Sequence, residues 1–400
     1  MPVVAMDAGG TAVVVWPDAS LAAGRAFSRR HAPGNGWSTL QQIDRDEGDV
    51  LGSVELAVDP IGNVVAVWSE RSDGLDPRDS IWFNRYSVDS GWETPVRLDS
   101  EDAGDASDPQ VAMDPNGNAI VVWHQFDGTQ ESIWAARSTP DDGWSAAELI
   151  ETENRGHAGD PRVAIDPDGN AIAVWHQSDG ARADVWANHF TPSGGWETAE
   201  RIETNREGEA RLPNVAMDPD GNAIAVWHQS DGSRLHIWSN RYTPSSRWGG
   251  AEQIDGDHLG DADHPRVGVD ADGNASAVWK QFDGNTVKIW ANRYSPDVGW
   301  GAPERIDTDS EGDALASNAI RQTEGIIHLQ RGRLEEARAA FAEVVERATA
   351  DEERYLRTAA LANLGTTLWR TGEHEEALRC LEESLTIRKR LGLVIEYAQI

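Results

Sequence analysis

Short apolar runs alternate with polar turns along most of this chain, and residues 214–254 show the pattern clearly. A run at 214–217 ends in Asp-Pro-Asp-Gly, where proline and glycine favour a tight hairpin turn. The run at 222–229 is apolar on both faces, as in a strand whose sheet is covered on both sides. A third run, 236–242, is rich in aromatic and β-branched residues, and a fourth spans 248–254. The pattern predicts four strands in a unit of 52 residues.

This unit occurs six times. The motif Val-Ala-Met-Asp-Pro-Asp-Gly-Asn-Ala-Ile-Ala-Val-Trp at 215–227 has relatives at 4–16, 56–68, 111–123, 163–175 and 267–279. The turn aspartates that mark the six copies are Asp7, Asp59, Asp114, Asp166, Asp218 and Asp270. Six four-stranded units in series are typical of the blades of a β-propeller. Six whole blades can close a ring, and a seven-bladed ring stays open if the natural chain extends upstream of Met1, which falls inside a repeat strand and suggests a fragment.

Tryptophan supports this fold. Seventeen of the 18 tryptophans lie in the repeats, and each of copies two to six has three of them. A four-stranded blade has little core of its own, so large flat rings that fill the gap between blades hold the array together. We therefore expect most of these side chains to pack between neighbouring blades.

The pattern changes to helical periodicity near Ala314. Two helix pairs are predicted, at 320–330 with 334–348 and at 354–370 with 374–391. The series Gly325, Gly332, Ala337, Phe341 recurs as Gly365, Gly372, Ala377, Leu381. This segment resembles tetratricopeptide repeats, in the longer-helix variety of kinesin light chains, and residues 394–400 resemble the start of a third repeat. The resemblance implies an all-α segment that binds a protein or peptide partner. The predicted domains are a β-propeller at 1–313 and tetratricopeptide repeats at 314–400.

Composition narrows the range of partners. The net charge is −33, and residues 319–400 carry 12 Lys and Arg against 14 Asp and Glu, so nearly all of this charge belongs to the repeats. Such an acidic surface repels nucleic-acid phosphate, and we expect no nucleic-acid binding. No apolar stretch is long enough to predict membrane insertion. The single cysteine, Cys380, excludes an internal disulfide. No signal peptide is visible, so the compartment is undecided between the cytoplasm and export of a longer chain.

The Asp-Pro-Asp-Gly-Asn turns could in principle share a calcium ion, because two carboxylates two residues apart suit a hard cation. A complete calcium loop needs further acidic ligands, and several copies lack the second carboxylate, as at Ala8-Gly9 and Pro60-Ile61. We interpret these turns as structural and expect no cofactor.

Two recurring sets of side chains are candidate ligand contacts. His124, His176 and His228 end the second strand of three adjacent copies, where they could face one mouth of the propeller. A metal ion needs histidines that converge, and the separation of adjacent blades disfavours this. Tryptophan and arginine lie three residues apart on the third strand, an arrangement suited to sugars or to a cation–π clasp between blades. These pairs are Trp82 with Arg85, Trp238 with Arg241, and Trp290 with Arg293.

The repeat string Asp-x-Asp-Gly-Asn-Ala-Ile-Ala-Val-Trp-His-Gln, followed by Ile-Trp-Ser-Asn-Arg-Tyr and Gly-Trp, resembles tryptophan-rich propeller repeats of bacterial proteins. It is more loosely similar to fucose-binding lectin propellers, and this resemblance implies a glycan as a second class of partner.

Catalysis has no motif to support it. The chain lacks a phosphate loop, a nucleophile elbow and His-Glu-x-x-His, and its carboxylates are spread by the repeat. We therefore predict a non-catalytic interaction scaffold that is not an enzyme. The first alternative is a multivalent lectin with one weak site per blade joint. A sialidase-like glycosidase propeller is a third hypothesis, and it would need a unique arginine cluster with a partner carboxylate.

Overall fold

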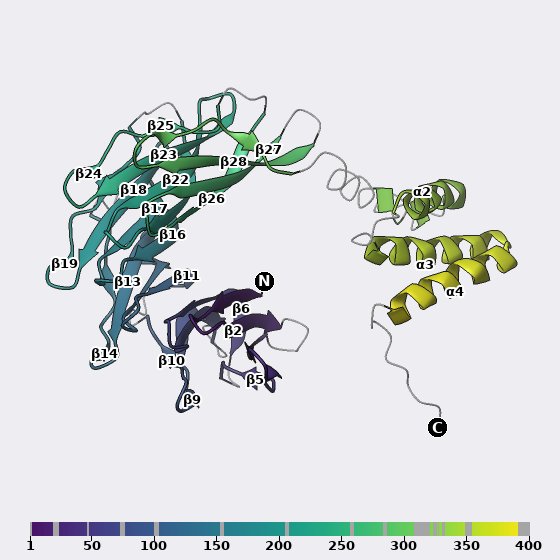
Figure 1. The fold of residues 1–400 in the computed structure, drawn as a ribbon, viewed down its shortest axis with the longest axis horizontal. Coiled ribbons are helices and arrows are strands. Elements are labelled where there is room, and N and C mark those ends of the chain that lie inside the picture. The colour runs from purple at the N-terminus through teal and green to yellow at the C-terminus, as the bar shows by residue number, and fades with distance from the viewer. Residues whose placement is uncertain are drawn as a thin grey trace. The chain divides into compact units, whose positions relative to one another are not determined.

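The computed structural model describes residues 2–18, 24–45, 48–72, 77–99, 104–152, 156–204, 208–256, 260–282, 286–307, 321–322, 326, 328–329, 333–348 and 354–390. The chain divides into two compact units, Met1–Arg305 and Ile306–Ile400. The first unit contains six antiparallel sheets in sequence order, one for each repeat (Figure 1). The second unit is helical. These observations confirm the predicted fold class, a six-bladed propeller array followed by an all-α segment.

Every sheet has the same plan of three long strands and two short ones. Sheet one contains β1 (Val3–Met6), β2 (Ala12–Asp18), β3 (Arg25–Ala32), β4 (Gly36–Trp37) and β5 (Gln41–Gln42). Sheet two contains β6 (Asp49–Val58), β7 (Val64–Arg71), β8 (Asp79–Ser87), β9 (Gly91–Trp92) and β10 (Val96–Arg97). Sheet three contains β11 (Ala106–Met113), β12 (Ala119–Phe126), β13 (Glu131–Thr139), β14 (Gly143–Trp144) and β15 (Glu148–Leu149).

The second half of the array repeats this plan. Sheet four contains β16 (Ala158–Ile165), β17 (Ala171–Ser178), β18 (Ala183–Thr191), β19 (Gly195–Trp196) and β20 (Glu200–Arg201). Sheet five contains β21 (Ala210–Met217), β22 (Ala223–Ser230), β23 (Leu235–Thr243), β24 (Arg247–Trp248) and β25 (Glu252–Gln253). Sheet six contains β26 (Ala262–Val269), β27 (Ala275–Phe282), β28 (Val287–Ser295), β29 (Gly299–Trp300) and β30 (Glu304–Arg305).

Two details differ from the predicted strands. The first strand begins earlier, at Ala210 in sheet five, and carries a bulge between Arg211 and Asn214, where Leu212 has a φ of 50°. Pro213 has no N–H to donate, so a bulge is where a strand accommodates it. The predicted fourth strand is divided into two short strands, which both pair with the third strand.

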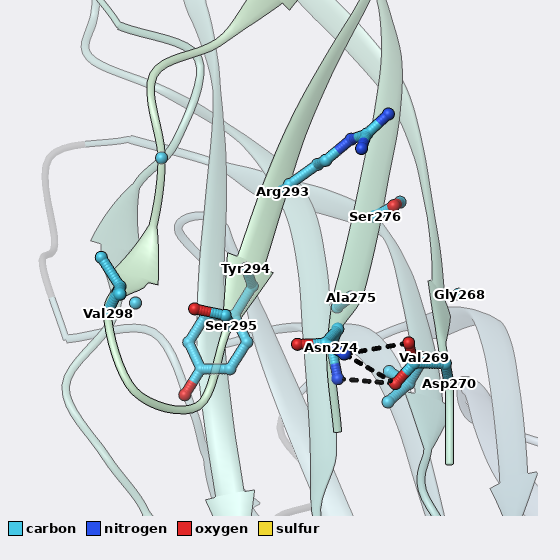
Figure 2. A pocket seen from close by; sticks show the side chains of 12 residues that line it. Gly268, Val269, Asp270, Asn274, Ala275, Ser276, Arg293, Tyr294, Ser295 and Val298 are labelled. Atoms are coloured by element: carbon cyan, nitrogen blue, oxygen red, sulfur yellow. Dashed lines mark hydrogen bonds between the residues drawn. The ribbon is translucent and has the colours of Figure 1, made fainter. Parts of the chain in front are cut away.

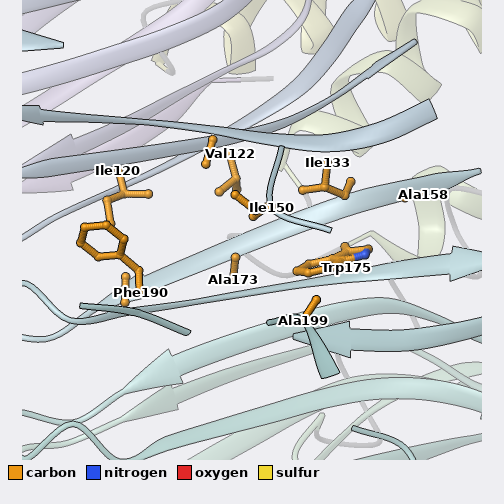
Figure 3. Close-up of a cluster of buried hydrophobic side chains, with 11 residues drawn as sticks. Ile120, Val122, Ile133, Ile150, Ala158, Ala173, Trp175, Phe190 and Ala199 are labelled. Atoms are coloured by element: carbon orange, nitrogen blue, oxygen red, sulfur yellow. The ribbon is translucent and has the colours of Figure 1, made fainter. Parts of the chain in front are cut away.

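Apolar side chains fill the joints between consecutive sheets. Figure 3 shows the joint between sheets three and four, where Ile120, Ile133 and Ile150 face Trp175 and Phe190. Equivalent clusters fill the other four joints between consecutive sheets. The three tryptophans of sheets two to six face the preceding sheet in these clusters, and the tryptophan that ends the second strand is the most deeply buried of them.

A buried asparagine ties consecutive sheets through their backbones. Asn188 Nδ2 donates to the carbonyl of Ile150 in the preceding sheet at 2.8 Å and to the carbonyl of Glu197 at 2.9 Å. Asn84, Asn240 and Asn292 bond the preceding sheet in the same way. Sheet three has Ala136 at this position. The asparagines therefore explain part of the recurring Asn-Arg pair.

The substitution Asn188→Ala should destabilise the first unit by about 1–2 kcal/mol, because the buried carbonyl of Ile150 and the partly buried carbonyl of Glu197 lose a donor. Urea unfolding followed by tryptophan fluorescence measures this change. Asn35→Ala, at an exposed turn position, serves as the control and should leave the midpoint unchanged. Equal midpoints for the two variants would contradict the role of the asparagine.

Among the described residues, no apolar cluster joins sheet six to sheet one. The central strand β17 is buried on both faces over its first five residues, whereas β27 alternates between buried and more accessible positions. One face of sheet six and one face of sheet one therefore take part in none of the five joints that the described residues form.

The helical unit contains α2 (Leu334–Arg347), α3 (Arg354–Thr371) and α4 (His374–Arg390). Phe341, Leu364 and Leu368 are buried at the centre of these helices. A Cβ on Gly365 would lie 2.8 Å from Leu381, so the small residue permits close helix packing. The helix predicted at 320–330 lies largely outside the described residues, and the predicted third repeat at 394–400 lies wholly outside them. None of the described helices is both long enough and apolar enough to span a membrane.

Candidate functional site

One register position of the first strands carries a set of polar side chains that differ from sheet to sheet. The position lies four residues before the turn aspartate in each sheet. In sheets two to six it is occupied by Glu55, Gln110, Arg162, Asn214 and Arg266, which we call the inner-strand cluster, and in sheet one by Val3. First strands of consecutive sheets contact one another, so they form the inner edge of the array. The side chains at this position therefore differ in charge and in hydrogen-bonding groups from one inner strand to the next.

The charges of the inner-strand cluster act on a single carboxyl group. Glu55 is half-buried on β6 and receives a side-chain hydrogen bond from Gln110 of the next sheet. Burial raises the pKa of the Glu55 carboxyl, and Arg162, Gln110 and Arg266 offset this rise only in part. Because residues of sheets two, three, four and six all affect this carboxyl, the first strands converge on it.

The two arginines of the cluster repel each other. Burial lowers the pKa of the Arg162 guanidinium, and Arg266 lowers it further. Each arginine also donates to the carbonyl of its preceding proline, Arg162 at 3.0 Å and Arg266 at 2.9 Å. These bonds use one nitrogen of each fork and leave further donors for an anion. Two guanidinium groups thus act on one half-buried carboxyl in a strongly acidic protein.

The predicted histidines lie beside this cluster, at the bulges of the first strands. His124 Nε2 is 2.7 Å from Ser107 Oγ, and His176 Nδ1 is 3.1 Å from Asp160 Oδ2. His228 Nδ1 is 2.5 Å from Asp263 Oδ1 of the next sheet. Each of the three histidines therefore has its own polar partner.

The surroundings of Asp160 shift its pKa in the direction opposite to the shift of Glu55. The hydrogen bond from His176 lowers the pKa of the Asp160 carboxyl, although burial opposes this, and the charges of His176, Arg162 and His124 lower it further. Arg162 interacts with both Glu55 and Asp160. Two carboxyl groups that both interact with one guanidinium, and whose pKa values are displaced in opposite directions, are the arrangement expected of an acid and its ionised partner.

The second residue of the predicted His-Gln pair has a structural role. Gln177 Oε1 accepts the Nε1–H of buried Trp175 at 3.1 Å. The same bond recurs in sheets three, five and six, and Glu70 replaces the glutamine in sheet two. The glutamine is therefore retained as the partner of the tryptophan, whereas the histidine points to the bulge.

The tryptophan–arginine pairs are separated by the sheet that carries them. Trp82, Trp238 and Trp290 pack in the joint with the preceding sheet. Residues three apart on a strand point to opposite faces, so the arginines face the following sheet. Arg85 donates to the Gly117 carbonyl at 3.1 Å, and Arg241 lies 5.8 Å from the ring centre of Tyr294. Within one sheet the structure does not bring tryptophan and arginine together, and a sugar site at these residues stays a prediction.

The turn aspartates bond their own turns. Asp166 Oδ1 accepts the N–H groups of Asp168 at 3.0 Å and Asn170 at 2.8 Å, and Oδ2 accepts the side chain of Asn170 at 2.8 Å. In the part of the chain that the structure describes, no three histidine, cysteine, aspartate or glutamate side chains lie close enough to hold a metal ion.

The inner-strand cluster was not among the residues predicted from the sequence. Its signal lies in the repeat alignment, where the position before Val-Ala-Met-Asp changes between Glu, Gln, Arg and Asn while its neighbours stay apolar. When a polar residue changes from copy to copy inside a strand that is otherwise apolar in every copy, core packing does not determine which residue type stands there.

Comparison with known proteins gives a family match for part of the helical unit and a set of similar solved structures. Residues 317–390 match the tetratricopeptide repeat family, which indicates protein–protein interaction for this segment. No curated protein matches the chain. Similar solved structures include a protein of unknown function from Dyadobacter fermentans, at 13% identity and a TM-score of 0.47 over 73% of this chain and 93% of that one. An α-L-arabinofuranosidase of Fusarium graminearum is similar at 16% identity and a TM-score of 0.47, over 74% of this chain and 93% of that one. A leech intramolecular trans-sialidase is similar at 10% identity and a TM-score of 0.44, over 74% of this chain and 68% of that one.

The prediction of a non-catalytic interaction scaffold that is not an enzyme is wrong on this comparison, because the similar structures of named activity are propellers of arabinofuranosidases, an arabinanase and sialidases. At these identities the likeness is one of fold, so a reaction has to be argued from the residues. The near-identity of the repeats concealed the one register position that differs between them. The partner of the helical segment, the glycan, the bacterial and lectin-like character and the boundary at 313 stay predictions.

Proposed function

We propose that the propeller unit binds and hydrolyses a glycoside with an acidic sugar at the inner-strand cluster. The observation that carries this proposal is the asymmetric set of Glu55, Arg162 and Arg266 at one position of a repeated strand. A catalytic group has to be placed once, and this is where the repeat departs from its own symmetry.

Each member of the cluster has a role in this reaction. The guanidinium groups of Arg162 and Arg266 bind the carboxylate of the sugar through paired hydrogen bonds. Glu55, whose pKa burial raises, is the acid that gives a proton to the leaving-group oxygen. Asp160, whose pKa is lowered, stays ionised and stabilises the positive charge that develops on the sugar ring. A water molecule then adds to the anomeric carbon and gives up a proton to the Glu55 carboxylate, which restores the acid.

Fluorogenic glycosides test the proposal. The purified chain is assayed on methylumbelliferyl glycosides of a uronic acid, a sialic acid and neutral arabinose. We expect turnover of an acidic glycoside, and Glu55→Gln should lower kcat by a factor of about 10²–10⁴ because the amide cannot donate the proton. Arg162→Met should raise KM for the acidic glycoside. Glu252→Gln, at an exposed carboxylate, is the control and should retain full activity.

The pH dependence should be bell-shaped. Activity falls at high pH as Glu55 loses its proton, at a pH above the ordinary range of a glutamate. It falls at low pH as Asp160 gains a proton, at a pH below the ordinary range of an aspartate. Glu55→Gln should abolish the alkaline limb in the residual activity. Equal turnover by wild type, Glu55→Gln and Arg162→Met, or no turnover of any of the glycosides, would overturn the proposal.

A further inference from the structure

Ser107, Asp108 and His124 lie together at the bulge of the first strand of sheet three. Ser107 on β11 is paired in register with His124 on β12, and Ser107 Oγ is 2.7 Å from His124 Nε2. The other ring nitrogen, Nδ1, is buried without a hydrogen-bond partner among the described residues, and Asp108 Oδ2 is 3.7 Å from it. A hydroxyl, an imidazole and a carboxylate in this order are the components of a nucleophile activated by a base.

Two carboxylates act on this histidine. Asp108 is the nearer one, and Glu131 at the start of β13 also interacts with His124. Both can stabilise the imidazolium that forms when the histidine takes the proton of the serine. The 3.7 Å between Nδ1 and Oδ2 is longer than a hydrogen bond, and catalytic hydrogen bonds commonly tighten when the substrate binds.

Of the five sheets whose first strands carry this bulge, only sheet three has the serine, the histidine and the aspartate together. Sheet four has a histidine and an aspartate at the equivalent positions but no hydroxyl. The pairs equivalent to Ser107 and His124 in the other four sheets are Leu51 with Ser69, Gly159 with His176, Arg211 with His228, and Asp263 with Lys280. A nucleophile has to be placed once, and the repeat departs from its own symmetry here.

The bulge also provides a backbone donor beside the serine. Asp108 and Pro109 have no partner in the ladder with β12, a strand that the structure describes in full. Asp108 has a φ of 51°, and such a conformation of a residue other than glycine often occurs at functional sites. Because a bulged residue is left out of the ladder, the N–H of Asp108 follows directly after the serine as a donor for an oxyanion.

A small pocket adjoins the serine. Its volume of about 90 Å³ equals that of about three water molecules. This space suits an acyl group of two or three carbon atoms and excludes a long acyl chain. The residues that line it are Leu51, Gly52, Ser69, Asp79, Ser107, Asp108 and Pro109.

The larger pocket on sheet six contains hydroxyl groups without a base. Figure 2 shows Ser276 and Ser295 among the residues that line this pocket of about 780 Å³, where Asn274 bonds the turn aspartate Asp270. None of the residues that line it is a histidine. An activated nucleophile is therefore a property of the small pocket in sheet three and not of the larger one.

We propose that Ser107 is the nucleophile of an esterase site in sheet three. His124 is its general base, and Asp108 is the residue that positions the histidine. The substrate class is a carboxylic ester with a small acyl group. The site uses no residue of the inner-strand cluster, so it does not rest on the proposed glycoside hydrolysis.

The reaction proceeds through an acyl-serine. Ser107 Oγ attacks the carbonyl carbon of the ester while its proton passes to His124 Nε2, and the N–H of Asp108 stabilises the oxyanion that forms. His124 gives the proton to the alcohol oxygen as the C–O bond breaks. Water then attacks the acyl carbon and loses a proton to His124, the carboxylic acid departs, and the proton returns to Ser107. Ester and water thus yield alcohol and acid.

Covalent labelling of the full chain tests the nucleophile. A fluorophosphonate with a short alkyl group should form a bond between its phosphorus and Ser107 Oγ with loss of fluoride, and peptide mass spectrometry locates the adduct. Ser107→Ala and His124→Gln should both lose this adduct. Ser90→Ala, at an exposed turn of sheet two, is the matched serine control and should be labelled like the wild type.

Hydrolysis of 4-nitrophenyl esters tests the reaction. Wild type should release a burst of nitrophenol from the acetate ester and turn over the octanoate ester at least about 10-fold more slowly, because the pocket is small. Ser107→Ala and His124→Gln should each lower kcat by a factor of about 10³ or more. Asp108→Asn should lower kcat by less and leave KM unchanged, because asparagine keeps the shape of the side chain and tolerates a positive φ.

Circular dichroism of each variant verifies its fold before these comparisons. A wild type that is neither labelled nor active on the acetate ester would overturn the proposal, as would equal turnover by wild type and Ser107→Ala. Labelling of Ser107 that persists in His124→Gln would also overturn it, because the serine would then react without this base. Neither measurement requires a glycoside, so the result is independent of the proposed glycosidase activity.

Discussion

Replacing Trp175 with alanine is expected to destabilise the propeller unit by about 4 kcal/mol, toward the upper part of the range for large-to-small core changes. Trp175 is fully buried and packs against Ile133 and Ile150 of the preceding sheet. Its loss opens a cavity in the joint between sheets three and four. It also removes the Nε1–H that Gln177 accepts, and Gln177 is 2% exposed. A buried amide oxygen without its donor adds about 1–3 kcal/mol.

Equilibrium urea unfolding, followed by far-ultraviolet circular dichroism, measures this effect. Trp175→Phe should recover about half of the loss, because it restores apolar area but not the N–H donor. Trp196→Ala removes a tryptophan of the same joint that is only partly buried, and should cost less than Trp175→Ala. An equal loss for Trp175→Ala and Trp196→Ala would contradict the view that burial at the end of the second strand decides the stability of the joint.

The repeat made most of the propeller fold readable from the sequence. The turn aspartates and the aromatic third strands marked the units, and proline with glycine marked the hairpins. The bulge of the first strand was missed because Pro213 made the expected strand begin only at Asn214. A proline is tolerated there only because Leu212 adopts a positive φ. That compensation depends on pairing with β22 and has no local signal.

The candidate site was harder to predict, for a physical reason. His124, His176 and His228 drew attention because they recur, but recurring residues in a repeat usually serve the joints. Glu55 and Arg162 lie more than 100 positions apart in the chain and come together only because inner strands converge. Their proximity follows from the curvature of the array, which no single repeat encodes. The helical unit was predictable from its small residues because those act within one hairpin.

Replacing Glu151 with glutamine is expected to stabilise the protein by about 3 kcal/mol at pH 8 and by less than about 1 kcal/mol at pH 5. Glu151 is 5% exposed, and burial raises its pKa to about 7, although Ser132 and the N–H of Ile133 oppose the rise. An unfolded glutamate has its model value of 4.5. Between these two values the native state holds a proton that the unfolded state has released. Wild-type stability therefore falls as the pH rises through this window, and glutamine removes the dependence.

The equivalent position in sheet two, Asp99, provides a control for which the expected change in stability has the opposite sign. Asp99 Oδ1 accepts the N–H of Ile81 at 2.7 Å, as Glu151 accepts that of Ile133, but Asp99 Oδ2 is also 2.6 Å from Arg97. Asp99→Asn should therefore destabilise the protein at pH 8, because it removes the buried carboxylate with which Arg97 forms an ion pair. Urea unfolding of both variants at pH 5 and pH 8 measures the difference. If Glu151→Gln were destabilising by the same amount at both values, the carboxyl would be ionised in the native joint, and the fourth strands would be held by charge and not by a neutral hydrogen bond.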